Sequence, residues 1–441
     1  DVTGEYSPAL WNNDFWGNAL QRNDSHKSYR PLTILSFRLT RELWYSKEDL
    51  DYAWKLDATP FHVENLFLHF VISILVFDMA SALDRLGPST GNSGHHISTA
   101  TALLFAAHPA NTEAVISVVG RSDLLGALLA LAGFSIFHRF ANKYLRLGPA
   151  STSSPTNNAC ITSVALCFQF LLASGLVIAA ILCKETSFMM LPVIAAYAVL
   201  LALSNKAAQS VVRSTKYVVG KIFLVVGVLF SLSIGYLIFR HQLTGAGLSV
   251  GQSVFRRTEN PMAFAPEFST RMLSKAHIHA FYASILLWPS QLSVDYSMDC
   301  IPLITSIGDF RNLRACTLYL FVLVAILVSV PWVRLFRIFT CRSRQVLSDS
   351  TTDAQPDANE QQDNITQHPT TNSAIGTSDQ DPGQKRPADT CEDVYSIVDQ
   401  RVAHRLPVAF CAAFFVGFSL PYSNIIFDVG TCVAERLLYV D

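Results

Sequence analysis

Long apolar runs separated by short polar segments dominate the chain. A bilayer core takes about 20 apolar residues per helix, and eight runs are candidates to cross it: 62–83, 97–118, 122–141, 160–182, 187–204, 217–239, 313–333 and 406–427. A ninth stretch, 277–289, is too short to cross and is predicted to be a re-entrant or interfacial helix. The pattern predicts an all-α polytopic membrane protein.

Residues 160–204 form nearly one apolar block, which only Lys184, Glu185 and Thr186 interrupt. As a single helix the block would extend roughly 68 Å, at about 1.5 Å per residue, whereas the hydrocarbon core is about 30 Å thick. The chain must therefore fold back. Lys184 and Glu185 are predicted to lie at a tight turn on one membrane face.

Composition agrees with this pattern. Hydrophobic residues make up 50% of the 441 and charged residues only 15%, against roughly 25% charged in an average soluble domain. The mean hydropathy is +0.30, which argues against a water-soluble globular enzyme. A net charge of -1 leaves no electrostatic footprint for nucleic acid. The nine cysteines form no C-x-x-C pair, so we expect no zinc ribbon, disulfide scaffold or metal site.

Lysine and arginine residues set the predicted orientation. Arginines crowd the end of the run 313–333, which places that end in the cytoplasm. The other face then receives a first loop at 1–61 and a second at 240–312, and the membrane domain covers 62–344. Residues 345–405 are polar and predicted to be a disordered cytoplasmic loop, followed by a last span and the start of a further segment in 406–441.

The first loop raises two expectations. The chain begins at Asp1 rather than Met and shows no signal-peptide pattern, so we expect an upstream span to be missing. Asn23 lies in the sequon Asn23-Asp24-Ser25 on the non-cytoplasmic face and is a predicted glycosylation site.

Ionisable residues gather at the same face, because an ionised group at mid-membrane costs about 2.5–3.5 kcal/mol. The segment from His108 to Glu113 interrupts an apolar run, and Pro109 should kink its helix. Arg121 and Asp123 follow within one loop. This cluster is either a set of salt bridges that fixes the helix ends or a site for an anionic, polar substrate.

Four further groups leave similar alternatives open. Lys184 and Glu185 form either a solvated turn or part of such a site, Asp295 lies in a loop, and Glu435 and Arg436 form either an interfacial pair or a phosphate contact. Near the start, the aromatic side chains around Asp14 are typical of interfacial anchors, but Asp14 is also a plausible carboxylate base or sugar ligand. Arg30 adds a planar guanidinium group that can donate two hydrogen bonds to an anion.

Eight sequence phrases run in order over essentially all of the chain except the loop 345–405: Asn13-Asp14-Phe15-Trp16-Gly17, Ser25-His26-Lys27-Ser28-Tyr29-Arg30-Pro31-Leu32, His108-Pro109 with Thr112-Glu113-Ala114-Val115, Val119-Gly120-Arg121-Ser122-Asp123-Leu124-Leu125, Cys183-Lys184-Glu185, Asp295-Tyr296-Ser297-Met298 with Ile301-Pro302-Leu303, Asp309-Phe310-Arg311-Asn312, and Leu420-Pro421-Tyr422-Ser423-Asn424 with Ala434-Glu435-Arg436-Leu437-Leu438-Tyr439. Together they resemble one family, the transmembrane and tetratricopeptide-repeat containing proteins.

The resemblance implies a multi-pass endoplasmic-reticulum membrane protein with a GT-C-type glycosyltransferase fold. It implies transfer of mannose from dolichyl-phosphate mannose to Ser/Thr of secretory-pathway proteins, notably cadherins, with no cofactor beyond this donor. Members carry a lumenal tetratricopeptide-repeat region after the membrane part. They also carry an acidic pair in the first lumenal loop, upstream of where this chain begins.

The implied reaction is one inverting displacement at the anomeric carbon, which needs a carboxylate base and cationic groups for the leaving phosphate. The best candidate for the base is the missing acidic pair upstream. Within this chain, Asp14 is the first candidate for a catalytic carboxylate near the sugar. Glu113 and Asp123 are expected to hold sugar hydroxyls or the acceptor, and Arg121, Lys184 and Arg436 compete for the phosphate. The full predicted set of donor- or acceptor-binding residues is Arg30, His108, Glu113, Arg121, Asp123, Lys184, Glu185, Asp295, Glu435 and Arg436.

Two other classes of protein fit the spans. A non-catalytic membrane scaffold would rely on the family's repeats to bind partners, and its function would survive loss of these charges. A transporter would place charges near the midplane and show inverted repeats, and the sequence shows neither feature.

Overall fold

The computed structural model describes residues 8–22, 25–46, 57–86, 93–146, 157–204, 212–244, 257–290, 292–293, 296, 300–329, 407–408 and 410–411. The chain divides into one unit of residues 1–330 and 404–441 and a second unit of residues 331–403, which lies outside the described ranges. All regular structure in these ranges is helical. Among the described residues, six helices are long and apolar enough to cross a membrane: Thr59–Asp84, Arg121–Leu145, Ile161–Cys183, Glu185–Ala202, Val219–Leu243 and Arg311–Val328.

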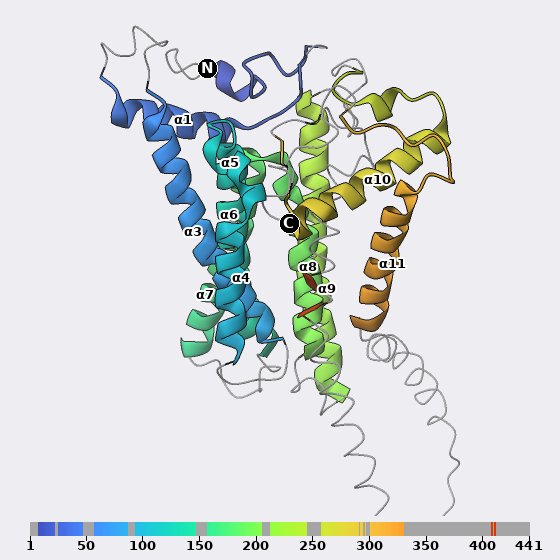
Figure 1. The fold of residues 1–441 in the computed structure, drawn as a ribbon. Coiled ribbons are helices and arrows are strands. Elements are labelled where there is room, and N and C mark those ends of the chain that lie inside the picture. The colour runs from blue at the N-terminus through green and yellow to red at the C-terminus, as the bar shows by residue number, and fades with distance from the viewer. Residues whose placement is uncertain are drawn as a thin grey trace, which may run out of the picture. The chain divides into compact units, whose positions relative to one another are not determined.

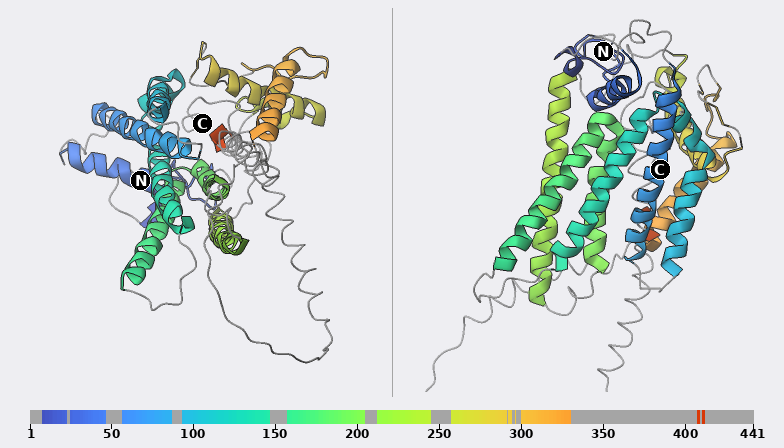
Figure 2. Two further views of the ribbon diagram at one scale, coloured as in Figure 1. Left: turned by 90° about the horizontal axis from the view of Figure 1, so that it is seen from below. Right: turned by 90° about the vertical axis from the view of Figure 1, so that its left-hand side faces the viewer.

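Four helices from the first part of the chain pack side by side (Figures 1 and 2): α3 (Thr59–Asp84) contacts α4 (Ser93–Ala107) and α6 (Arg121–Arg146), and α6 contacts α7 (Asn157–Cys183). Glycines allow α6 to approach its neighbours closely. A Cβ on Gly133 would lie 2.9 Å from Val177 Cγ2 of α7, and one on Gly126 would lie 2.8 Å from Ser187 Oγ, just after the end of α7. Any larger side chain at these two positions would push α6 away from these neighbours.

The predicted break at Lys184 is confirmed. The helix α7 ends at Cys183, the short 3-10 helix η4 (Glu185–Met189) follows, and α8 (Met190–Ser204) continues from it. Both α7 and α8 contact α6, as a chain that folds back at this junction requires. The next helix, α9 (Val212–Thr244), packs against α8.

The run 97–118 differs from the expectation of one span. The helix α4 ends at Ala107, and the chain continues as η3 (Pro109–Asn111) and α5 (Thr112–Ile116). With 15 residues, α4 would extend only roughly 22 Å, and it is not among the six spanning helices. Pro109 has no N–H to donate to the preceding turn, so it starts a new turn. The expected kink is therefore a full break.

The stretch 277–289 belongs to a longer helix than expected. After the short helix η6 (Pro261–Phe264), α10 spans Phe268–Leu287 and packs against α11 (Arg311–Ser329). Several polar residues of its first half are buried, among them Thr270, Ser274 and Lys275, which the apolar pattern could not reveal. Ile278, Tyr282 and Ile285 pack with Ala110 of η3, so α10 lies beside the break after α4. Its re-entrant or interfacial character and the GT-C fold stay predictions.

The first loop folds over one end of the helices. The short helix η1 (Pro8–Trp11) begins the described chain, and α1 (Pro31–Trp44) lies across the ends of α3 and α6 (Figure 1). Ile34 and Phe37 of α1 are buried, whereas Leu43 and Trp44 are exposed. This arrangement brings the residues before α1 to the first turn of α6. Most of the predicted last span 406–427 lies outside the described residues.

Candidate functional site

Five polar residues from three separate segments form one connected group, which we call the polar cluster: Arg30, Ser122, Asp123, Lys184 and Glu185. Arg30 Nε donates to Glu185 Oε2 over 2.9 Å, and Arg30 Nη1 donates to Ser122 Oγ over 3.4 Å. Arg30 directly precedes α1, Ser122 lies in the first turn of α6, and Glu185 begins η4. The predicted convergence of these segments is thus seen in their contacts.

A second ion pair closes the cluster. Lys184 Nζ lies 2.8 Å from Asp123 Oδ1, and each of these side chains is only 7% exposed. Burial lowers the pKa of Lys184, the positive charge of Arg30 lowers it further, and Asp123 opposes both effects. The pair therefore holds the junction between α7 and η4 against the start of α6.

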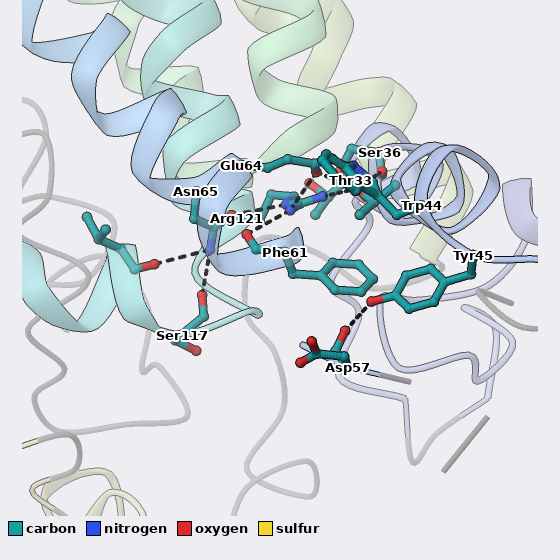
Figure 3. A network of polar contacts seen from close by, with 12 residues as sticks. Thr33, Ser36, Trp44, Tyr45, Asp57, Phe61, Glu64, Asn65, Ser117 and Arg121 are labelled. Atoms are coloured by element: carbon teal, nitrogen blue, oxygen red, sulfur yellow. Dashed lines mark hydrogen bonds and ion pairs between the residues drawn. The ribbon is translucent and has the colours of Figure 1, made fainter. Parts of the chain in front are cut away.

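Arg121 belongs to a different network, shown in Figure 3. Its Nε donates to Asn65 Oδ1 over 3.0 Å, and its Nη1 donates to Thr40 Oγ1 over 2.6 Å. Its Nη2 donates to the carbonyl oxygen of Phe61 and lies 2.9 Å from Glu64 Oε2. The side chain is 2% exposed, so all three guanidinium nitrogens are committed to buried protein partners.

Two aromatic rings also contact Arg121. We call Arg121 and its partners the clamp: Phe37, Thr40, Phe61, Glu64 and Asn65. The Arg121 guanidinium carbon lies 5.1 Å from the centre of the Phe37 ring of α1 and 5.2 Å from that of the Phe61 ring of α3. Such cation–π contacts are worth roughly 2 kcal/mol or more when desolvated. Because Ser122 and Asp123 follow directly, the clamp fixes the turn of α6 that enters the polar cluster.

Asp14 organises its own loop. Its Oδ1 accepts from the backbone N–H groups of Trp16 and Asn18, and its Oδ2 accepts from Ser25 Oγ and the backbone N–H of His26, all within 3.2 Å. The side chain is fully buried. Four donors on two oxygens favour a role in shaping the loop, and the catalytic role of Asp14 stays a prediction.

His108 lies on the side of the bundle that faces α10. His108 Nδ1 accepts from the Ala110 N–H over 3.2 Å, so Nε2 carries the proton and donates to the carbonyl oxygen of Leu286 over 3.0 Å. Glu113 is buried within α5. The hydrogen bonds of His108 therefore tie the break after α4 to the end of α10.

Arg240 lies near the cluster, although the sequence pattern did not single it out. Arg240, at the end of α9, interacts electrostatically with Glu185 and donates to the hydroxyl oxygen of Tyr236 over 3.3 Å. Arg240 directly follows the apolar run 217–239, and its position at the end of a span was the available signal. Within the described ranges, no three His, Cys, Asp or Glu side chains are grouped to hold a metal. Asp295, Glu435, Arg436 and the sequon residue Asn23 lie outside those ranges.

Comparisons with known proteins converge on one family. The family model described as "Protein O-mannosyl-transferase TMTC, DUF1736" matches residues 249–323. The mouse protein O-mannosyl-transferase TMTC4 is 33% identical over 330 residues, which cover 70% of this chain and 40% of the relative. The human protein O-mannosyl-transferase TMTC3 is 31% identical over 323 residues, covering 71% and 30%. The chain belongs to the TMTC family.

A third TMTC relative matches almost the whole chain. The Xenopus laevis protein O-mannosyl-transferase tmtc2 is 28% identical over 450 residues, which cover 98% of this chain and 46% of the relative. The chain thus spans less than half the length of these TMTC proteins. No solved structure shows a significant match to it.

The segment that matches the TMTC model contains a tightly bonded turn before α11. The Arg311 side chain donates to both oxygens of Asp309 and to the carbonyl oxygens of Pro302 and Leu303. The hydrogen bonds that Asp309 accepts from the side chain and the backbone N–H of Arg311 lower its pKa to about 2. Ser274 of α10 accepts from the Ile304 N–H over 2.9 Å. The turn therefore fixes α11 to α10.

Proposed function

We propose that this TMTC chain is the membrane portion of an enzyme that transfers mannose from dolichyl-phosphate mannose to Ser/Thr hydroxyls of secretory-pathway proteins such as cadherins. The reaction takes place at the lumenal face of the endoplasmic reticulum membrane. The names of the TMTC relatives support the transferase activity. Among the structural observations, the polar cluster carries the proposal.

The polar cluster places charged side chains in a buried environment, which costs free energy of desolvation. It holds two ion pairs, Arg30–Glu185 and Lys184–Asp123, whose side chains are all between 7% and 17% exposed. Buried ion pairs give little net stability, because desolvation offsets the attraction between the charges. Ionisable groups near membrane helices more often mark a functional site than a source of stability. These charged side chains would have a role if a polar, charged substrate binds at this end of the helices.

The chemistry is one displacement. The acceptor oxygen forms a bond to the anomeric carbon, the bond from that carbon to the phosphate oxygen breaks, and the phosphate leaves with the electron pair. A carboxylate base takes the proton of the acceptor hydroxyl. Cationic groups stabilise the phosphate as its charge grows. The sugar passes through an oxocarbenium-like transition state, by analogy with glycoside hydrolysis.

In this proposal the roles are divided as follows. Asp14 is a carboxylate near the sugar, and Glu113 and Asp123 contact sugar hydroxyls or the acceptor. Lys184 and Arg436 contribute positive charge toward the phosphate. The bonding of all three Arg121 nitrogens favours a positioning role for that residue.

A transfer assay tests the function. The full-length protein is expressed in cells that lack other O-mannosyltransferases, together with a cadherin-domain reporter, and hexose on Ser/Thr is measured by mass spectrometry. We expect hexose that requires both the protein and a supply of dolichyl-phosphate mannose. Asp78→Asn serves as the matched control, because this carboxylate is 38% exposed and pairs only loosely with Arg139 at 4.0 Å. No hexose from a well-expressed protein, or hexose that persists without the donor, would contradict the proposal.

A further inference from the structure

The ion pair between Arg30 and Glu185 is only half made. A guanidinium and a carboxylate often form two parallel hydrogen bonds, but here only Arg30 Nε and Glu185 Oε2 are joined. Glu185 Oε1 is buried and has no hydrogen-bond partner among the described residues. Arg30 Nη2 likewise has no hydrogen bond to any residue in the described ranges. One strong donor and one strong acceptor of the same ion pair therefore remain unused.

A buried carboxylate oxygen without a hydrogen-bond donor indicates a binding site for a ligand, because leaving it unpaired costs roughly 1–3 kcal/mol or more. An ionised carboxylate can only accept, so the missing group must donate a hydrogen. The free guanidinium nitrogen can only donate, so its missing partner must accept. A sugar phosphate offers both groups within one head: hydroxyls that donate and phosphate oxygens that accept.

The pair lies among other charged groups and can be reached by a ligand. Lys184 pairs with Asp123, and Arg240 interacts electrostatically with Glu185. Each side chain of the Arg30–Glu185 pair is 17% exposed, so the pair is reachable from outside.

Aromatic rings surround the pair. The Arg30 guanidinium lies over the Phe15 ring at 5.2 Å from its centre. Tyr29, next to Arg30, packs against Phe239 of α9 at 6.2 Å between ring centres. Phe188, three residues after Glu185, stacks on Tyr236 at 5.3 Å. Ligand sites commonly combine such apolar walls with a few polar groups that fix orientation.

We propose that Arg30 and Glu185 bind the head of the glycosyl donor, with Arg30 Nη2 donating to the phosphate and Glu185 Oε1 accepting from a mannose hydroxyl. Arg121 is excluded from this role, because its nitrogens are committed within the clamp. Lys184 is more deeply buried than Arg30 and bonds to Asp123, so it contributes charge near the phosphate without donating to it directly. The planar fork of arginine also suits phosphate better than an ammonium group does. The proposal rests on the proposed function and names where its donor binds.

Binding measurements separate this proposal from transfer itself. The purified full-length protein in detergent is titrated by calorimetry with citronellyl-phosphate mannose and with citronellyl phosphate, which lacks the sugar. Arg30→Lys keeps the charge but removes the fork, and we expect it to weaken binding of both ligands about tenfold. Glu185→Gln should weaken binding of the mannosylated ligand about tenfold and leave the sugar-free ligand unchanged. Asp78→Asn should leave both affinities as in the wild type, and inorganic phosphate alone should bind far more weakly than either lipid.

Deoxy donors test the hydroxyl contact without depending on the folding of any variant. In the wild-type protein, one of the 2-, 3-, 4- and 6-deoxymannosyl analogues should bind about tenfold more weakly than the parent. The same analogue should lose nothing further in Glu185→Gln, because the two changes remove one shared contact.

Two results would overturn the subsite: wild-type protein that binds all deoxy analogues equally, or Glu185→Gln that binds every ligand as the wild type does. Tight, Glu185-dependent binding without any mannose transfer would uphold the subsite and contradict the enzyme. Normal mannose transfer and normal donor affinity in both Arg30→Lys and Glu185→Gln would uphold the enzyme and contradict the subsite.

Discussion

Lys184 Nζ and Asp123 Oδ1 lie 2.8 Å apart in an ion pair that is almost sealed from solvent. Removing one member of such a pair strands a buried charge, which costs far more than the intact pair contributes. The pair joins the junction after α7 to the first turn of α6. Its integrity therefore affects both the fold and the polar cluster.

Asp123→Asn should destabilise the protein by about 3 kcal/mol, because the Lys184 ammonium stays buried without its counter-charge. The measurement is the thermal unfolding midpoint of the purified protein in detergent. The double variant Asp123→Leu with Lys184→Met removes both charges and should recover most of the loss. A single variant that unfolds at the wild-type temperature, or a double variant no better than the single, would contradict this account.

Arg121→Lys should destabilise the clamp by on the order of 3 kcal/mol, because an ammonium group cannot reach the partners of a guanidinium on α1 and α3 together. The thermal midpoint should fall, and proteolysis in α1 should increase. Arg139→Lys is the matched control, because the Arg139 side chain is 66% exposed and its pair spans 4.0 Å. Equal stability of the two variants would mean that the clamp is dispensable.

Gly120→Ala should cost at least about 2 kcal/mol, because a Cβ there would lie 2.2 Å from the carbonyl oxygen of Ala114. The neighbour is backbone, so α5 and α6 must separate to relieve the clash. Gly175→Ala is the control on α7, where a Cβ meets nothing within 4 Å. It should be neutral or stabilise the helix by about 0.5–1 kcal/mol. The measurement compares thermal unfolding midpoints. An unchanged midpoint for Gly120→Ala would show that α5 can move away from α6 at little cost in stability.

Asp14→Asn should loosen the first loop, because an amide replaces one acceptor oxygen by a donor that faces two other donors. We expect trypsin to cleave after Arg22 several-fold faster than in the wild type. Glu42→Gln, which changes an exposed carboxylate of α1, should leave the rate unchanged. A variant with an intact loop but no mannose transfer would instead assign Asp14 to the chemistry.

The sequence predicted much of the architecture, because hydropathy and helix length act locally. The break at Lys184 followed from length alone, and the structure confirms it. The break at Pro109 was underestimated, because the apolar run continues across it and hides how short α4 is. The start of α10 was missed for the opposite reason, since Ser274 and Lys275 are polar but buried.

The candidate site was predicted less completely. Position in the chain grouped Lys184 with Glu185 and Arg121 with Asp123, but hydrogen-bond partners are decided by tertiary packing. The structure instead separates Arg121 from Asp123 and joins Arg30 to Glu185. Arg240 was not predicted, because nothing in its immediate sequence distinguishes it from an arginine that merely ends a span.

The contact between Arg30 and Glu185 also sets an order of events during synthesis. The two residues are 155 positions apart in the chain, and at about 5–20 residues per second the ribosome needs roughly 8–30 s to go from one to the other. During that interval α3, α6 and α7 must enter the membrane while Arg30 has no carboxylate to meet. The pair that we propose to bind the donor is thus completed only after the junction at Lys184 has been made, so a chain that stalls before Glu185 should not bind donor through it.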